Sequence, residues 1–336
     1  MKKRPGDRSK WNSKKIFSGW DYLEMYEDIA KNRAKTVLLI LGFIFFISLI
    51  GYFIGMYFDY RYGYGTAFSI VLLVLALVIA LFVSAGSYYF SDRIVLSLTG
   101  ARPLSRQKDT RVYYMVEGLA IAAGVPMPAI YEIPDTGLNA FATGRNPQNG
   151  VIVFTRGLLE GLDDEELKGV ISHELAHIKN YDILLGTVIV VLVGMISILA
   201  NIMARFMLFG GRGRRSSKSG GGAIMIILLV IGIIFILLSP LVATIIRMAV
   251  SRSREYLADS SGSLITRYPA GLANALKKIK DNSQVRKANS ATAHLFINNP
   301  LGRDSKVIFK KLFDSHPPID ERIERLEKMS LGIGTS

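Results

Sequence analysis

The chain has 336 residues, of which half are hydrophobic, with a formal net charge of +14 and no cysteine. The apolar residues are gathered in blocks, which excludes an ordinary soluble domain, and the lack of cysteine excludes disulfides and thiolate metal ligands. The basic residues flank the apolar blocks and no nucleic-acid-binding module is visible, so nucleic acid is not an expected partner.

Four apolar blocks dominate the chain, and each reaches the roughly 20 residues that a helix needs to cross a bilayer core. The first block starts too late and is too long for a cleavable signal peptide. Blocks three and four are interrupted by Asn201 and Pro240, so they either cross the bilayer fully or enter it without crossing. The pattern predicts an integral membrane protein with about four transmembrane helices. The blocks run over residues 37–58, 67–88, 183–203 and 223–246.

The basic residues are unevenly distributed around these blocks. Residues 1–35 are rich in Lys and Arg, whereas Arg61 is the only basic residue between the first two blocks. The positive-inside rule therefore puts the N-terminus and the segment after block two in the cytoplasm. The basic, Gly-rich loop 208–222 would lie outside after two full crossings, against this rule, so the topology of the second hairpin stays open. Apolar residues at helical spacing in 16–30 predict either an interfacial helix or a solvated tail.

The segment after block two has the composition of a soluble domain. Residues 108–123 show helical periodicity, with Gly124 as a C-cap and Pro126 as a stop. Three short antiparallel strands are expected next, followed by a longer helix with acidic residues in its first turn. The strands are predicted over residues 129–133, 138–143 and 150–154, and the helix over Asp163–Asn180.

This longer helix contains the pentapeptide His173-Glu174-Leu175-Ala176-His177. Histidines four residues apart lie on one helix face, so both imidazoles can bind one metal ion. Glu174 is placed to accept a proton from a water that the metal activates, rather than to bind the metal. A catalytic zinc ion takes three protein ligands, and without cysteine the third is His, Asp or Glu. The chain has four histidines, the other two being His294 and His316.

A second helix is predicted directly after block four, in the segment Ser251-Arg-Ser-Arg-Glu-Tyr-Leu-Ala-Asp259. If blocks three and four form a hairpin, this helix returns to the same membrane face as the histidine-bearing helix. Glu255 can then meet the two histidines. Asp259 lies one turn further on the same face and can hydrogen-bond the outer nitrogen of a ligand histidine, which fixes its tautomer.

Together these motifs resemble the HtpX family of membrane metalloproteases, which is related to the type I CAAX prenyl proteases. The resemblance extends over residues 37–328. It implies a mainly α-helical membrane protein with an α+β, zincin-like (gluzincin) catalytic domain. Further marks are LNAFATG at residues 138–144, HLFINNP at 294–300 and SHPPIDER at 315–322.

The resemblance also implies the roles of the site residues. It implies one zinc ion per chain, with Glu255 as the ligand beside His173 and His177, and Asp259 hydrogen-bonded behind them. It implies a proteolytic site that faces the cytoplasm and serves membrane-protein quality control.

Two further assignments concern substrate and transition state. The strand at Asn139 and Ala140 is expected to be an edge whose backbone binds the extended substrate, with a purely structural strand as the alternative. His316 is expected either to stabilise the oxyanion formed during attack or to serve only the fold. His294 is expected to cap or pack.

The motifs also divide the chain into five parts. Helical hairpins are expected to alternate with two protease parts that together form one site. The parts are a basic N-terminal extension (1–35), a transmembrane hairpin (36–90), a first protease part (91–182), a second hydrophobic hairpin (183–246) and a second protease part (247–336).

The sequence therefore predicts a zinc endopeptidase in the inner or plasma membrane, with polypeptide substrates that are above all misfolded or damaged membrane proteins. The runner-up is a prenyl-protein endopeptidase, which would need a large chamber for the lipid. A membrane adaptor with structural zinc would need four protein ligands. A transporter would carry ionisable residues within its spans, and the first two blocks have none.

Overall fold

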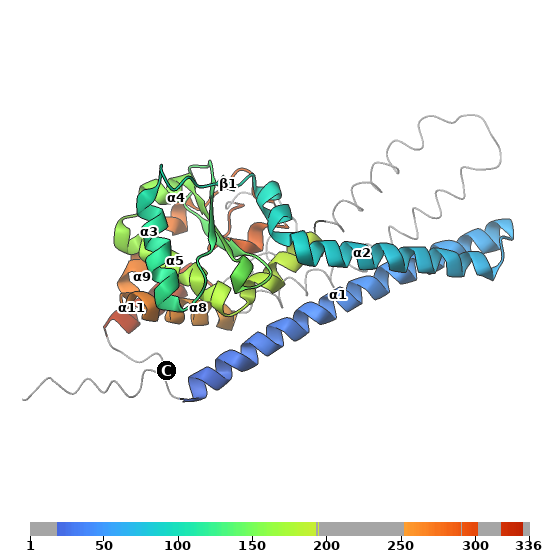
Figure 1. The fold of residues 1–336 in the computed structure, drawn as a ribbon, viewed down its shortest axis with the longest axis horizontal. Coiled ribbons are helices and arrows are strands. Elements are labelled where there is room, and N and C mark those ends of the chain that lie inside the picture. Colours follow the sequence, from blue (N-terminus) through green and yellow to red (C-terminus); the bar gives the residue numbers. More distant parts are fainter. Residues whose placement is uncertain (1–18, 193, 195–251, 290, 302–316, 332–336) are drawn as a thin grey trace, which may run out of the picture.

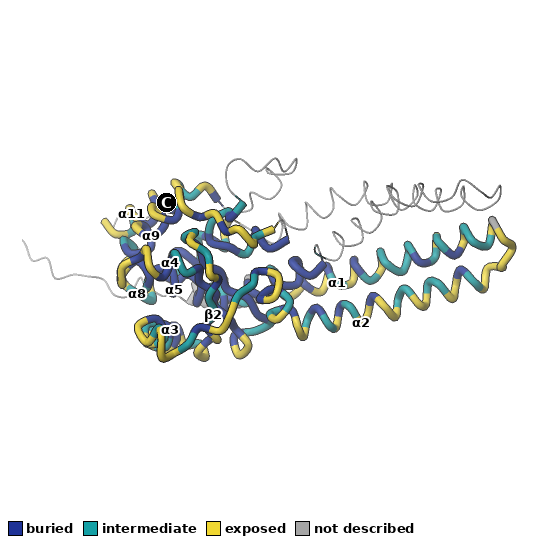
Figure 2. The backbone as a smooth tube through the Cα atoms, turned by 90° about the horizontal axis from the view of Figure 1, so that it is seen from above, coloured by how far each residue is buried: buried dark blue, intermediate teal, exposed yellow. Residues whose placement is uncertain are grey.

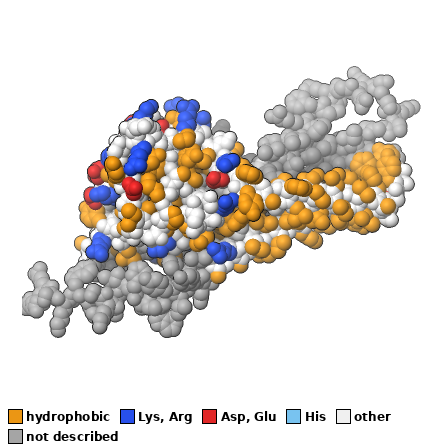
Figure 3. Space-filling model, viewed as in Figure 1, with side chains coloured by type: hydrophobic (Ala, Val, Ile, Leu, Met, Phe, Trp, Pro, Cys, Tyr) orange, Lys and Arg blue, Asp and Glu red, His pale blue; other side chains and the backbone are white. Residues whose placement is uncertain are grey.

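Two long antiparallel helices, α1 (Gly19–Tyr62) and α2 (Thr66–Thr99), form a hairpin that projects from a body built around a small sheet (Figure 1). Residues 32–60 and 66–99 are apolar enough to cross a membrane, with mean hydropathies of 2.8 and 3.0. Many residues of the hairpin are exposed where it stands free of the body (Figure 2), and apolar side chains cover that part (Figure 3), as expected of a surface that meets lipid. This computed structural model describes residues 19–192, 194, 252–289, 291–301 and 317–331.

A third apolar segment follows α5 (Asp164–Lys179), with a bend of 83° between α5 and residues 182–192. Within the described residues, two helices can cross a membrane, or three if this bent pair is one span. Two of the four predicted spans are thus present. The rest of the third block, the fourth block, Asn201, Pro240 and loop 208–222 lie outside the described residues.

The N-terminal part of α1 differs from the expectation for residues 16–30. The helix runs without a break from Gly19 into the apolar segment, so the described part of this stretch is the beginning of a 44-residue helix. Asn32 and Thr36 on this helix are each only 3% exposed. The end of the basic stretch, at Asn32, is therefore buried inside the protein.

The sheet is mixed, which corrects the predicted antiparallel sheet. Its strand order is β1-β2-β4-β3, and β2 runs parallel to β4 whereas β3 is antiparallel to β4. The error was to assume that consecutive strands are neighbours. Both β3 and β4 are buried along their whole length, so local burial gives no signal for which of the two is the central strand. The strands are β1 (Arg102–Pro103), β2 (Ala129–Ile133), β3 (Ala140–Thr143) and β4 (Val151–Thr155).

Helices pack around the sheet and share one apolar core with it. The two predicted helices of this region are confirmed: α3 ends at Gly124 with φ 71°, and α5 starts with a capping box between Asp163 and Glu166. The other elements are α3 (Thr110–Ala123), α4 (Arg156–Gly161), α8 (Arg252–Thr266), α9 (Pro269–Asn282) and α11 (Ile319–Ser330), with short 3-10 turns at Pro147–Asn149 and Ala293–Leu295.

The helices α5 and α8 touch at Gly262. A Cβ at this position would lie 2.9 Å from the backbone nitrogen of His173 and 3.1 Å from its Cα. We expect Gly262→Ala to lower the free energy of unfolding by about 1–3 kcal/mol, because backbone atoms cannot yield to the added methyl group. Thermal or denaturant unfolding of the purified protein measures this.

The matched control is Gly118→Ala in the middle of α3, where an added Cβ meets nothing within 4 Å. Alanine has the better helix propensity, so this change should leave stability unchanged or raise it by about 0.5–1 kcal/mol. Equal effects of the two substitutions would contradict the close approach of α8 to α5.

Candidate active site

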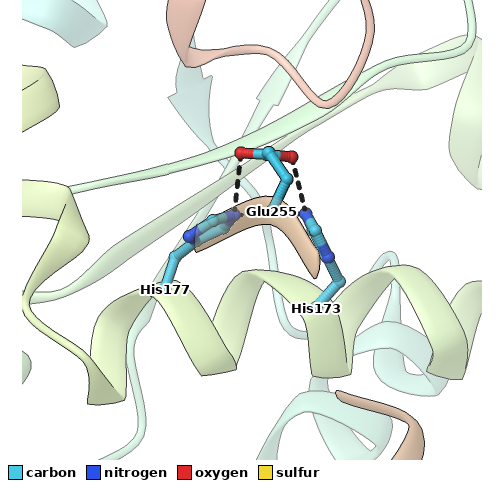
Figure 4. A group of neighbouring side chains, drawn as sticks. All are labelled: His173, His177 and Glu255. Atoms are coloured by element: carbon cyan, nitrogen blue, oxygen red, sulfur yellow. Dashed lines mark hydrogen bonds and ion pairs between the residues drawn. The ribbon is translucent and has the colours of Figure 1, made fainter. Parts of the chain in front are cut away.

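Three side chains from two helices converge inside the body (Figure 4). His173 and His177 lie one turn apart on α5, and Glu255 comes from the neighbouring α8. The Nε2 atoms of the two histidines are 3.2 Å apart. The carboxylate oxygens of Glu255 lie 3.8 Å from Nε2 of His173 and 3.7 Å from Nε2 of His177. One donor atom from each residue thus lies within 4.8 Å of the others, close enough to hold a single metal ion.

A carboxylate lies behind each histidine. Oδ1 of Asp259 is 3.0 Å from Nδ1 of His173, and Oδ2 of Asp182 is 3.0 Å from Nδ1 of His177. Nδ1–H of His177 donates to Asp182, and the Asp259 carboxylate lies at ion-pair distance from Nδ1 of His173, so each Nε2 faces the other histidine and Glu255. Two lone pairs and a carboxylate that face one buried point repel unless a proton or a cation lies among them. A divalent metal ion therefore fits these residues.

Glu174 lies in the same cavity, next to the first histidine. The cavity measures about 50 Å³, and a water needs roughly 10–15 Å³, so a metal ion and a few waters fit. Burial, assisted by Glu255, raises the pKa of Glu174 to about 7 against the opposing effect of His177. A carboxyl group with such a pKa can take up and return a proton near neutral pH. Other lining residues include Ala142, Ile183, Gly186, Arg254, His294 and Leu295.

Known proteins match this chain over most of its length. The profile of peptidase family M48 matches residues 106–330. A curated protein of Tropheryma whipplei, "Protease HtpX homolog", is 40% identical over 310 residues, which cover 91% of this chain and 98% of that protein. This chain is an HtpX-type member of peptidase family M48. The proteins of the same name from Dictyoglomus turgidum and Thermoanaerobacter pseudethanolicus are 42% and 44% identical, over 90% and 91% of this chain and 94% and 98% of theirs.

The resemblance read from the sequence is thereby confirmed, and the protein is a metallopeptidase that hydrolyses peptide bonds. With two helices that can cross a membrane, it is a membrane metallopeptidase. Among solved structures, the crystal structure of S. mikatae Ste24p matches with a TM-score of 0.43 and 20% identity, over 91% of this chain and 67% of that chain.

Arg322 is a residue of this M48 site that the sequence patterns did not single out. Its side chain is 1% exposed, and its Nε and Nη2 donate to the two carboxylate oxygens of Asp259 at 2.9 and 2.7 Å. Its Nη1 lies 3.3 Å from Oε2 of Glu255, and its Nη2 lies 3.3 Å from Nε2 of His173. The signal was present, because Arg322 lies on the apolar face of α11 one turn before Leu326.

Asp182 is the second missed residue of the M48 site. It follows α5 by three positions, after Tyr181, whose φ of 59° lies in the left-handed region. This turn brings the Asp182 carboxylate back against His177. Because the chain leaves the helix between the two residues, helical periodicity carries no signal for the contact.

The residues expected at the substrate edge are engaged within the protein. Asn139 is fully buried, and its amide donates to the carbonyls of Ser283 and Asn298 at 2.8 and 2.9 Å. The carbonyl of Ala140 accepts a hydrogen bond from the Ile297 amide at 2.9 Å. Of strand β3, Ala142 is the residue that lines the cavity.

Of the two remaining histidines, the structure describes His294. His294 is 4% exposed, its Nε2 lies 3.1 Å from the carbonyl of Gly186, and it lines the cavity of this M48 peptidase. It therefore packs, as expected, but does so at the site. His316 lies outside the described residues, and its role as oxyanion stabiliser stays a prediction.

Proposed function

We propose that this chain is a zinc-dependent endopeptidase that cleaves membrane proteins, above all misfolded or damaged ones, at the cytoplasmic face of the cell membrane. The observation that carries the proposal is the convergence of two imidazoles and a carboxylate in the cavity that contains Glu174. Ligands, a base and room for water then belong to one site, as metal-assisted peptide hydrolysis requires.

The donor set supports zinc. Two imidazole nitrogens and one carboxylate oxygen are ligands of catalytic zinc sites, which keep a further position open. His173, His177 and Glu255 would hold the ion, which supplies Lewis acidity toward a water and a peptide carbonyl. Asp259 and Asp182 keep the imidazoles in the tautomer that binds metal.

Glu174 has the role of general base and then general acid. It accepts a proton from the attacking water and returns it to the leaving amine. In the metal-free protein its pKa of about 7 lies near neutrality, which suits a group that takes up and returns a proton.

The edge of β3 is the proposed docking edge for an extended substrate. Within the described sheet this strand pairs with β4 alone, and on its other side the Ala140 carbonyl is taken by the Ile297 amide, so a substrate would extend the edge at Ala142. Asn139 and Ala140 anchor that edge through their contacts inside the protein. Ala142, which lines the cavity, is then the residue of β3 nearest the scissile bond.

The surroundings of the cavity support membrane-protein substrates. Ile183 and Gly186, which line it, begin the third apolar segment, and that segment packs in one cluster with residues of α1 and α2. The site therefore lies beside the membrane helices. Lys and Arg are concentrated in residues 1–35 rather than at the turn between α1 and α2, which supports a cytoplasmic site.

The test is proteolysis by the purified protein in detergent, with a misfolded membrane protein and a prenylated peptide as alternative substrates. We expect cleavage of the membrane protein, loss of cleavage after metal removal by a chelator, and recovery with one equivalent of zinc. Cleavage that survives complete metal removal would overturn the proposal. Preferred cleavage of the prenylated peptide would favour the prenyl-protein endopeptidase.

Metal binding should release a proton from His177. Burial alone would lower the pKa of this imidazole, but Asp182 and Glu255 raise it to about 9 in the metal-free protein. Burial lowers the pKa of His173 to about 4, so His173 is already neutral. At pH 8 the ion must therefore displace about one proton, and the apparent affinity should rise about tenfold per pH unit up to pH 9. Calorimetric zinc titrations in buffers of different ionisation enthalpy measure this, and a heat independent of the buffer would contradict it.

A further inference from the structure

A buried hydrogen bond connects the first membrane helix to the metal-site region. The side chain of Asn32 in α1 is 3% exposed, and its Nδ2 donates to Oδ1 of Asp182 at 2.7 Å. The two residues are 150 positions apart in the chain, so the contact depends on the tertiary fold. A buried amide and a buried carboxylate both need partners, and this bond fixes each of them against the other.

The same carboxylate orients a proposed metal ligand. Oδ2 of Asp182 lies 3.0 Å from Nδ1 of His177, whereas Oδ1 accepts from Asn32 and lies 3.4 Å from Nη1 of Arg254. Because a carboxylate is planar and rigid, donors that hold Oδ1 also determine where Oδ2 points. The orientation of the His177 ring therefore depends on a residue of α1.

The turn that carries Asp182 is in contact with α1 at a second point. Tyr181 adopts the left-handed conformation, and the guanidinium of Arg33 lies 4.6 Å from the centre of its ring. Beyond the turn, residues 184–192 share an apolar cluster with α1. Two consecutive residues of α1 thus contact two consecutive residues of the turn, so a rotation or shift of α1 would move the turn with it.

We propose that Asn32 is a positioning residue of the metal centre, which acts through Asp182 on the orientation of His177. The inference rests on the proposed function, in that His177 must bind the metal ion. It gives the first membrane helix a part in the chemistry beyond anchoring, because the affinity of the site depends on how α1 lies against the turn at Tyr181.

The test is the zinc affinity of Asn32→Leu in the full chain, purified in detergent and measured by competition with a chelator. Groups that orient a metal ligand directly are typically worth 10- to 100-fold in affinity. Asn32 acts one contact further out, so we expect a loss of roughly 3- to 10-fold. Cobalt-substituted protein should show a shifted visible absorption band, because the ligand ring is less firmly oriented.

Two comparisons separate positioning from general packing. Thr36→Val removes a hydroxyl one turn further along α1 that, among the described residues, bonds the Asn32 carbonyl at 2.9 Å. It should leave affinity and spectrum unchanged. Asp182→Asn should weaken zinc binding more than Asn32→Leu. Adding Asn32→Leu to Asp182→Asn should cause no further loss of affinity, because Asn32 acts through the carboxylate that is already gone.

The outcomes distinguish the inference from the function on which it rests. If the wild type binds no zinc, the proposed function fails. If the wild type binds zinc and Asn32→Leu binds it equally well with an unchanged cobalt spectrum, only the positioning role fails. Additive losses in the Asn32→Leu, Asp182→Asn double variant would also overturn it, because Asn32 would then act by another route.

Discussion

Replacement of Glu174 by Gln should abolish proteolysis while leaving metal binding intact. We expect kcat to fall by about 100- to 10,000-fold, the range for removal of a general base. The zinc content should stay at the wild-type level, because the converging donor atoms belong to His173, His177 and Glu255. Measurement of kcat and of bound zinc on the same preparation checks both expectations.

The electrostatics of the site explain why this substitution should not damage the fold. Burial raises the pKa of Glu174 to about 7, so this side chain is already neutral in much of the population at physiological pH. A neutral amide of the same shape is then a small change in the buried site.

Glu165→Gln on the same helix is the matched control. Glu165 is exposed and pairs with Lys168 at 2.7 Å on the surface, so its neutralisation should leave kcat and zinc content unchanged. Undiminished cleavage by the Glu174→Gln protein would remove Glu174 from the reaction. Loss of zinc together with activity would instead make it a ligand.

The part of the site that the sequence predicted is the part encoded within single helices. His173 and His177 share a face of α5 because of helical periodicity, and Glu255 and Asp259 share a face of α8 for the same reason. Such spacings survive any arrangement of the helices. The sequence alone could bring the two faces together only by assuming a hairpin between the helices. In the structure, α5 and α8 meet at Gly262.

What the sequence did not predict depends on contacts between distant segments. Asn32 lies in a basic stretch and Asp182 in a turn, and nothing local marks either as buried. The strand order failed for a related reason: each strand was recognisable, but β3 and β4 are both buried along their whole length, so no local pattern places β4 between β2 and β3. Arg322 could have been predicted from the sequence, because a charged residue on the apolar face of α11 needs a buried partner of opposite charge.

Arg322→Met should have the largest effect on stability. The change removes the partner of two buried carboxylates, because the guanidinium contacts Asp259 at 2.7 Å and Glu255 at 3.3 Å. Loss of one member of a buried ion pair typically costs about 3–5 kcal/mol, since the remaining charge stays buried without compensation. We expect the free energy of unfolding to fall by about this amount in denaturant titrations of the metal-free protein.

The pH dependence of this loss identifies its cause. Burial tends to raise the pKa of Asp259, but Arg322 and His173 hold it below its usual range. Without Arg322 burial prevails, so the pKa of Asp259 rises and the carboxyl group takes up a proton more readily as the pH falls. The gap in stability between the variant and the wild type should therefore be largest near neutral pH and shrink toward acidic pH.

Arg325→Met, which removes an exposed arginine one turn further along α11, should show a much smaller gap that does not change in this way. If the loss of unfolding free energy in Arg322→Met does not depend on pH, it comes from packing rather than from charge.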